Sequence, residues 1–323
     1  MRAPDFWHDD TLISRLLRPV SAIYAWVTAR RLAEANAYRP AVPVICIGNI
    51  VTGGAGKTPV CLSLVERLRK RGRHPHVLMR GYGGTEAGPR AVDPIRHDSA
   101  RVGDEALLLA AHAPTWVARW RPDGAVAAVA MGCDLLVMDD GFQNPSITKD
   151  LSLVVVDGGY GFGNGRVIPA GPCRETIAAG LARADAVVLI GEDISCAAAL
   201  LGDVPVLRAR LVPGPEAAAF QGRKVVAFAG IGRPGKFFDT VEACGGELVS
   251  AHSFPDHHPY TRAEIAELIE EAEEAGALLA TTAKDAVRVP REFRPMLSVL
   301  TVALEWEDPE ALDRMLDRVD SRF

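Results

Sequence analysis

The sequence predicts an α/β protein, with a parallel sheet between flanking helices, a smaller C-terminal α/β domain and an N-terminal amphipathic helix. Three observations support this prediction. Short runs rich in β-branched residues alternate with stretches of helical periodicity, the pattern of strand–helix–strand units. The chain has 323 residues, enough for two domains of ordinary size. A segment rich in proline and glycine, residues 212–223, interrupts the alternation and indicates a domain junction.

The first series of elements precedes this junction. Each expected strand is a short apolar run, and each expected helix carries apolar residues three and four positions apart. The expected strands cover residues 42–48, 76–80, 115–118, 134–138, 151–156 and 186–190. The expected helices cover residues 59–71, 103–111 and 122–131.

The second series follows the junction. Strands are expected at residues 225–229, 247–253, 278–281 and 298–303, and helices at 236–244 and 262–275. We therefore predict an amphipathic helical segment at 1–38, a larger α/β domain at 39–220 and a smaller α/β domain at 221–323.

The N-terminal segment has two distinct faces at helical spacing. Apolar residues form one face and small polar residues the other, and Pro19 either kinks the run or starts a second helix. The apolar face contains Leu12, Leu16, Val20, Ile23 and Val27. Only eleven uncharged residues separate Arg18 from Arg30, too few to span a bilayer. The segment either lies in a membrane interface or packs on its own domain.

Charge and cysteine content exclude several classes of protein. The net charge of −5 argues against a nucleic-acid-binding protein, although residues 1–40, Arg2 among them, carry six arginines against four acidic residues. The six cysteines are scattered, without metal-ligand or disulfide spacing, which fits a reducing cytosol. No obligate protein partner is evident from the sequence.

A phosphate-binding loop follows the first expected strand. Strand 44–48 leads into Thr52-Gly-Gly-Ala-Gly-Lys-Thr58, and a helical stretch comes next. Glycines allow backbone N–H groups to turn towards phosphate oxygens, and the helix N-terminus adds its dipole. This is the Walker A arrangement of a P-loop NTPase-like fold, which predicts nucleotide binding by Thr52, Gly53, Gly54, Ala55, Gly56, Lys57 and Thr58. Lys57 would neutralise phosphate charge and Thr58 would ligate Mg²⁺.

Two acidic residues end a later apolar strand, in the manner of a Walker B element. Asp139 and Asp140 follow the run 134–138. Ligands of α/β sheets bind at the carboxyl ends of the strands, and paired carboxylates there can hold Mg²⁺ directly or through water. A solvated turn is the alternative, but the upstream phosphate loop favours a metal site.

The motifs together resemble one family, the tetraacyldisaccharide (lipid A) 4′-kinases. The phosphate loop Gly48–Pro59 lacks the first consensus glycine, with Val51 in its place, as that family does. Further blocks follow in order: Arg80-Gly-Tyr-Gly83, Gly103-Asp-Glu105, Asp139-Asp-Gly-Phe-Gln143, Gly161-Phe-Gly-Asn-Gly165, Pro169-Ala-Gly-Pro172, Arg174-Glu175, Ala229-Gly-Ile-Gly232, Asp256-His-His-Pro-Tyr260 and Thr281-Thr-Ala-Lys-Asp-Ala-Val-Arg288.

The resemblance implies the reaction and its setting. Such kinases use ATP and Mg²⁺ to phosphorylate the 4′-hydroxyl of a tetraacylated glucosamine disaccharide 1-phosphate. Their N-terminal helix is thought to contact the inner membrane, so we expect segment 1–38 to be membrane-associated and this chain to lie at the cytoplasmic face of that membrane. Residues 39–220 would then form the P-loop kinase domain, and the domain at 221–323 would close over the nucleotide.

The resemblance also implies roles for particular residues. Asp104 is the expected proton acceptor, oriented by His257, with Lys57 and Arg174 stabilising the transferred phosphate. Glu175 is a further candidate metal ligand beside Thr58, Asp139 and Asp140. Arg80 and Arg119 lie at or just past expected strand ends, where they could meet the acceptor's phosphate. Lys284 and Asp285 could equally contact the nucleotide or only support the domain interface. From the residues alone, Asp104 could equally cap a helix, His257 could be a surface loop residue, and Arg174 could simply pair with Glu175.

Three other functions compete with a kinase. A membrane ATPase switch of the partitioning class would carry a second lysine where Thr52 stands. A GTPase would carry an Asn-Lys-x-Asp motif, which is absent from the sequence. A lipid-binding module would leave the phosphate loop and Asp139/Asp140 unexplained.

Overall fold

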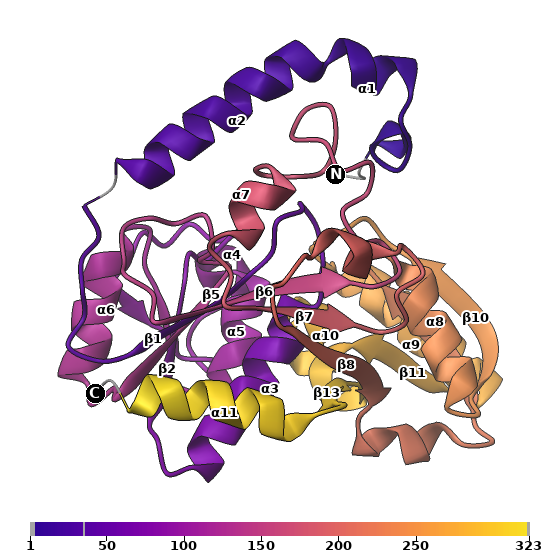
Figure 1. Cartoon of the computed structure of the whole chain (residues 1–323). Helices are drawn as coiled ribbons and strands as arrows, with labels where there is room; N and C mark the ends of the chain where they lie inside the picture. The colour runs from indigo at the N-terminus through magenta and orange to yellow at the C-terminus, as the bar shows by residue number, and fades with distance from the viewer. Residues whose placement is uncertain (1–3, 35, 322–323) are drawn as a thin grey trace.

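The computed structural model describes residues 4–34 and 36–321. Within them, nine strands form one sheet in the order β13-β8-β7-β6-β1-β5-β2-β4-β3, and four form a second sheet in the order β10-β9-β11-β12. The neighbours in both sheets are parallel except for β13 with β8 and β3 with β4. The predicted α/β class with two sheets is confirmed (Figure 1).

The first sheet carries the nucleotide-binding part of the chain. Its strands are β1 (Val44–Gly48), β2 (Pro75–Met79), β3 (Arg90–Ala91), β4 (Thr115–Val117), β5 (Leu135–Asp139), β6 (Leu151–Asp157), β7 (Ala186–Ile190), β8 (Val206–Pro213) and β13 (Val302–Trp306). The helices along this part are α3 (Lys57–Lys70), α4 (Ser99–Val102), α5 (Asp104–Ala110), α6 (Arg121–Ala130) and α7 (Ile177–Leu181), with a 3₁₀ turn at Ala197–Leu200.

Alternation along the central strands builds a core on each face of this sheet. Ile45 and Ile47 of β1 pack with helices α3, α5 and α11 (Pro309–Asp320), whereas Val44 and Cys46 pack with α6 and α7. All five residues of β1 are buried, as expected for a central parallel strand covered on both faces.

The second sheet has its own two-sided core. Its strands are β9 (Lys224–Ala229), β10 (Glu247–Ser253), β11 (Leu278–Thr282) and β12 (Ser298–Leu300). Phe237 and Val241 of α8 (Pro234–Ala243) cover one face, and Ile265 and Leu268 of α9 (Arg262–Ala275) cover the other. The connecting segments contain α10 (Ala283–Ala286) and the 3₁₀ turns Pro215–Phe220 and Arg291–Met296.

The end of the chain returns to the first sheet. The single strand expected at 298–303 is wrong, because β12 and β13 are separate strands in different sheets. The chain returns from the second sheet to the first at Thr301. The Thr301 carbonyl accepts a hydrogen bond from the N–H of Gly214, which follows β8 where the chain first leaves the first sheet. Residues 302–320 therefore pack with the first sheet, although they fall inside the predicted range 221–323, and α11 lies along that sheet (Figure 1).

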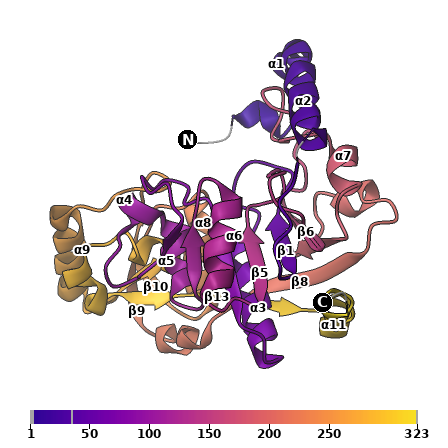
Figure 2. The ribbon, with the colours of Figure 1, turned by 90° about the vertical axis from the view of Figure 1, so that its left-hand side faces the viewer.

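The N-terminal helices stand apart from both sheets. After a 3₁₀ turn at Asp5–Trp7, α1 (Leu12–Leu16) is capped by Thr11, and α2 (Arg18–Ala33) carries Pro19 in its first turn. Proline thus starts a second helix, one of the two outcomes expected. Figure 2 shows both helices projecting from the body on the side away from the C-terminal domain. Residues 1–3, Arg2 included, and residue 35 of the predicted segment 1–38 lie outside the described residues.

Candidate active site

The phosphate loop joins β1 to α3 in the conformation that its glycines allow. Gly53 and Gly56 have positive φ angles of 106° and 87°, which residues with a Cβ rarely adopt. A Cβ on Gly56 would also lie 2.6 Å from Ile190 Cδ1. The helix begins at Lys57, directly after Gly56, so its free N–H groups and dipole point into the loop. Gly53 and Gly54 remain exposed, whereas the Thr52 N–H is bound to the Pro172 carbonyl at 2.9 Å.

Lys57 and the acids at the end of β5 meet beside this loop. Lys57 Nζ lies 3.6 Å from Asp140 Oδ1 and 3.4 Å from Asn49 Oδ1. Burial, and after it Glu105, raises the pKa of Asp139 to about 7. Burial also disfavours ionisation of Asp140, but Lys57 and Arg174 outweigh it and lower its pKa. Asp140 has a positive φ of 52°, a strained conformation of the kind found at functional sites.

The donors present fit a magnesium ion shared with phosphates. Asp139 Oδ1 is fully buried without a hydrogen-bond partner in the described structure, as expected of an oxygen that a cation or its water would satisfy. Thr58, also buried, follows Lys57 at the start of α3. No cluster of three or more His, Cys, Asp or Glu able to hold a metal is found among the described residues. An ion here would therefore complete its shell with phosphate and water oxygens, as Mg²⁺ usually does.

Arg174 and Glu175 point in different directions. Arg174 Nη1 donates to Asp140 Oδ1 at 2.9 Å, so the expected cation lies beside the phosphate loop. Glu175 is buried, and its carboxylate accepts from Gln143 Nε2 at 2.9 Å and from Arg183. These contacts assign Glu175 to the support of Gln143, which itself contacts Arg174 at 3.4 Å, and give no support to its expected role as a metal ligand.

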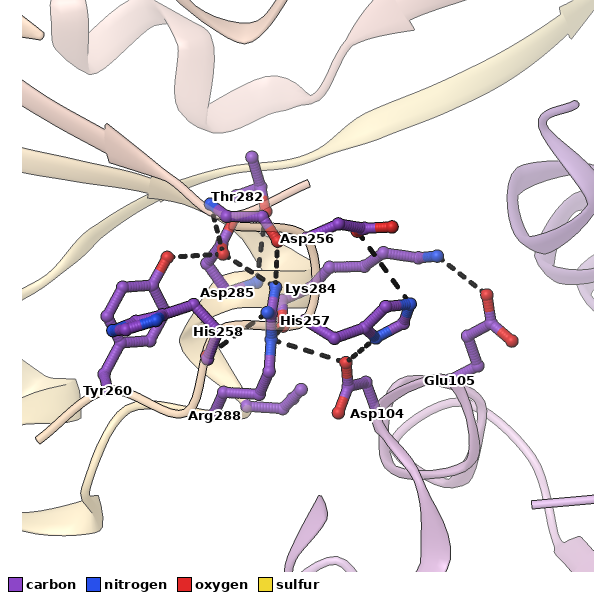
Figure 3. Close-up of polar contacts among 12 residues, drawn as sticks. Asp104, Glu105, Asp256, His257, His258, Tyr260, Thr282, Lys284, Asp285 and Arg288 are labelled. Atoms are coloured by element: carbon purple, nitrogen blue, oxygen red, sulfur yellow. Dashed lines mark hydrogen bonds and ion pairs between the residues drawn. The ribbon is translucent and has the colours of Figure 1, made fainter. Parts of the chain in front are cut away.

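Asp104 and His257 meet across the two domains (Figure 3). Asp104 is the first residue of α5, beside Gly103, whose φ is 89°. His257 Nδ1 lies 2.8 Å from Asp104 Oδ2, and this hydrogen bond raises the pKa of His257. His257 itself has a positive φ of 60°. The neighbouring His258 turns away to Glu264, at 2.9 Å, so of the two adjacent histidines only His257 contacts Asp104.

Two further ion pairs close the same interface. Lys284 Nζ lies 2.7 Å from Glu105 Oε1, and Arg288 Nε lies 3.3 Å from Asp104 Oδ2. Lys284 is a candidate site residue from the sequence. Arg288, Glu105 and Gln143 are recognised there only as members of their motifs, with no functional role predicted for them. After burial, the Glu105 carboxylate also helps raise the pKa of Asp139, so a residue of this interface acts on the acids of β5.

The arginines expected to meet the acceptor's phosphate are less involved. Arg80 is exposed just beyond β2, and Arg119 is exposed beyond β4, with Nη2 3.3 Å from the Thr85 carbonyl. Neither contacts the residues around Asp104 or the phosphate loop through a hydrogen bond or ion pair within residues 4–34 and 36–321. Their expected role stays a prediction.

The part of the chain built on the first sheet thus carries the phosphate loop with Lys57 beside Asp140, and the part built on the second sheet brings His257 to Asp104. This arrangement belongs to the P-loop phosphotransferases, which work by positioning and charge neutralisation. A family model described as tetraacyldisaccharide-1-P 4′-kinase matches residues 13–320. The chain belongs to this family.

Individual members of this family are similar to the chain over nearly its full length. The chain is 64% identical to the tetraacyldisaccharide 4′-kinase of Paramagnetospirillum magneticum, covering 100% of both chains. It is 55% identical to that of Rhodospirillum rubrum, covering 99% of this chain and 98% of the relative. Among solved structures, LpxK from Aquifex aeolicus in complex with ATP matches with a TM-score of 0.78 at 24% identity, covering 95% of this chain and 99% of that one, which shows the shared fold.

Proposed function

We propose that this chain transfers the γ-phosphate of ATP to the 4′-hydroxyl of a tetraacylated glucosamine disaccharide 1-phosphate, in lipid A biosynthesis. The family and the relatives' names support the acceptor. The observation that carries the reaction is the contact of Asp104 with His257 between the two domains, in a fold that also holds a phosphate loop with Lys57 next to Asp140. A partitioning-type ATPase switch, the alternative from the sequence, is not favoured.

Each residue has a task that follows from its position. The glycine loop and the N-terminus of α3 hold the phosphate chain, and Lys57 and Arg174 offset charge on the transferred group. Thr58, Asp139 and Asp140 would hold Mg²⁺, which when bound neutralises phosphate charge. Asp104 accepts the proton of the attacking hydroxyl, and His257 fixes the carboxylate through Oδ2.

We also propose that the acceptor is met at the cytoplasmic face of the inner membrane through α1 and α2. The small polar residues Ser14, Ser21 and Thr28 of these helices are buried against the protein. Their large apolar side chains point outward, with exposures of 71% for Leu16, 64% for Ile23 and 60% for Trp26. An apolar surface of this kind, flanked by Arg15, Arg18, Arg30 and Arg31, suits a helix lying in a lipid interface. Among the described helices, none is long and apolar enough to cross a bilayer.

Consumption of ATP with and without the lipid acceptor tests this proposal. ADP formation should depend on the tetraacylated disaccharide 1-phosphate presented in mixed micelles. Lys57→Ala should abolish that dependence, because it removes the phosphate-binding cation. Equal ADP formation with and without the lipid would favour an ATPase switch.

A further inference from the structure

Arg288 is a buried arginine at the centre of the interface that holds Asp104. Its side chain is only 4% exposed, and its Nε lies 3.3 Å from Asp104 Oδ2. His257 Nδ1 approaches the same oxygen at 2.8 Å. Figure 3 shows both groups converging from the C-terminal domain on one corner of the carboxylate.

Asp285 and the surrounding backbone hold the Arg288 guanidinium rigidly. Its Nη2 lies 2.7 Å from Asp285 Oδ1 and 2.9 Å from the Gly230 carbonyl, and its Nη1 lies 3.3 Å from the His258 carbonyl. Its Nε donates to the Lys284 carbonyl at 3.2 Å, so the contact of Nε with Asp104 is an ion pair. A planar guanidinium with its donors fixed in this way cannot turn away from Asp104 without losing several hydrogen bonds.

Asp285 is in turn fixed on all sides. Its carboxylate is fully buried and accepts from Gly230 N–H at 2.8 Å, Tyr260 OH at 2.6 Å and Thr282 Oγ1 at 2.5 Å. Burial and the Asp285 charge raise the pKa of Tyr260, which keeps its hydroxyl a donor. The Asp285–Arg288 pair is therefore a rigid support that reaches across to the other domain.

Both contacts to Asp104 fall on Oδ2, and no hydrogen bond to Oδ1 is found among the described residues. From this geometry, and resting on the proposed function, we propose that Arg288 is a positioning residue for the proton acceptor: supported by Asp285, it clamps Asp104 Oδ2 together with His257 and presents Oδ1 to the acceptor hydroxyl. The proton of that hydroxyl passes to Oδ1 as its oxygen bonds to phosphorus and the bond to ADP breaks.

Arginine and histidine contribute differently to this clamp. Arginine stays charged at every pH at which the protein is folded, so its contact with Oδ2 persists when His257 loses its proton. The charged groups near His257 are Asp104, Asp256 with Oδ1 3.9 Å from Nε2, the Lys284 cation, and Arg288 at the shared Oδ2. The Tyr82 ring also faces His257, with 6.4 Å between the ring centroids. Lysine at position 288 would keep the charge but could not meet Asp104, Asp285 and the Gly230 carbonyl together.

Steady-state kinetics of Arg288→Lys and Asp285→Asn test the proposal. Arg291→Lys is the matched control, because Arg291 also joins the domains, through the Ile95 and His97 carbonyls, but does not contact Asp104. We expect Arg288→Lys to lower kcat roughly 100-fold through misplacement of the acceptor, with KM for ATP and lipid changed by less than about twofold. Arg288→Lys/Asp285→Asn should be no worse than the poorer single variant, because the two residues act as one unit.

The pKa of His257, measured by NMR titration, distinguishes a positioning role of Arg288 from a purely structural one, which would leave that pKa unchanged. Arg288→Gln removes a positive charge beside the shared oxygen, so the pKa of His257 should rise above its wild-type value, while Arg291→Gln should leave it unchanged. If Arg288→Gln fails to fold because Asp285 is left buried without its cation, Arg288→Gln/Asp285→Asn removes both charges and takes its place.

Several results would overturn the proposal. Near-wild-type kcat in Arg288→Lys, an equal loss in Arg291→Lys, or a raised KM at unchanged kcat would each exclude a positioning role. If the wild-type enzyme phosphorylates no lipid, the proposed function fails instead. In that case the His257 titration alone tests the positioning role of Arg288. Equal pKa values of His257 in Arg288→Gln and Arg291→Gln would refute it.

Discussion

At the scale of single residues, the surroundings of each carboxylate determine what it can do. Asp139 and Asp140 are neighbours, yet burial raises the pKa of the first to about 7, while Lys57 and Arg174 lower that of the second. A cation beside Asp139 would favour its ionised form. Asp104 is paired differently, with the His257 hydrogen bond and the Arg288 ion pair on one oxygen, which suits a group that must accept a proton on the other.

Asp104→Asn should lower turnover by at least roughly 100-fold, the usual contribution of a general base. The amide keeps the shape of the side chain but cannot take the proton. Binding of ATP should change little, because the phosphate loop is untouched. Single-turnover phosphate transfer, with nucleotide binding measured by calorimetry, checks both parts. Near-normal transfer would rule out Asp104 as the acceptor.

The Asp104–His257 pair should make stability depend on pH in one direction. The pKa of His257 is raised in the folded protein, above its reference value of 6.5. Its protonated form therefore stabilises the fold at pH values below 6.5, and this contribution is lost as pH rises through the raised pKa. Denaturant unfolding of wild type and His257→Asn from about pH 5 to about pH 9 should show the largest difference at low pH. A difference that grows towards high pH would contradict the pairing.

At the scale of elements, the proposed function depends most on the turn into α3 and on the N-terminal helices. The turn leaves the first N–H groups of α3 facing the loop because Gly56 adopts a left-handed conformation that other residues rarely adopt. The N-terminal helices reverse the usual arrangement, with serine and threonine inward and leucine, isoleucine and tryptophan outward. Ser21 Oγ accepts the Ala170 N–H at 3.0 Å, and Trp7 Nε1 donates to the Pro169 carbonyl at 3.0 Å. The loop that contains Pro169 and Ala170 thus seats these helices through polar contacts.

Gly56→Ala should weaken ATP binding strongly. The alanine would need a left-handed backbone, at a cost of ~1–2 kcal/mol, and its Cβ would collide with Ile190. Gly72→Ala is the matched control: Gly72 also has a positive φ, 79°, but has open space around it and lies beyond the far end of α3. Both variants should lose stability, and only Gly56→Ala should lose nucleotide affinity by calorimetry. Equal affinities would show that the loop conformation does not matter for binding.

Exposed and buried positions of the N-terminal helices should respond oppositely. Replacing Leu16, Val20 and Ile23 by glutamine should reduce recovery with anionic lipid vesicles, while stability stays within about 0.5 kcal/mol. Ser21→Ala should instead cost ~1–3 kcal/mol of stability, because it leaves the Ala170 N–H buried without a partner. Vesicle sedimentation and thermal unfolding distinguish the two effects. Unchanged vesicle recovery in the triple variant would refute a membrane surface there.

At the scale of the whole molecule, local signals predicted what lies close in sequence. The phosphate loop, β1, and the acids after β5 follow from apolar runs and glycine spacing, and the structure has them together. Distant contacts left no such signal. The return of β13 to the first sheet depends on pairing with β8, some ninety residues earlier in the chain. Nothing in the local sequence distinguishes Arg288 from other arginines, because its contact with Asp104 is created only by the folded structure. The apolar face of α2 could be predicted from the sequence. Its direction could not, because it is set by hydrogen bonding of the polar face to the loop at 164–170.

In the proposed function, the two domains together assemble one site for phosphoryl transfer to a lipid hydroxyl. Single-turnover reaction of enzyme with ATP labelled at the γ-phosphate, in the presence of the tetraacylated disaccharide 1-phosphate, tests it most directly. With the wild-type enzyme, the label should appear on the 4′-oxygen of the lipid. With Lys57→Ala or Asp104→Asn, no more than a trace of the label should reach the lipid. Label released only as inorganic phosphate would contradict the claim.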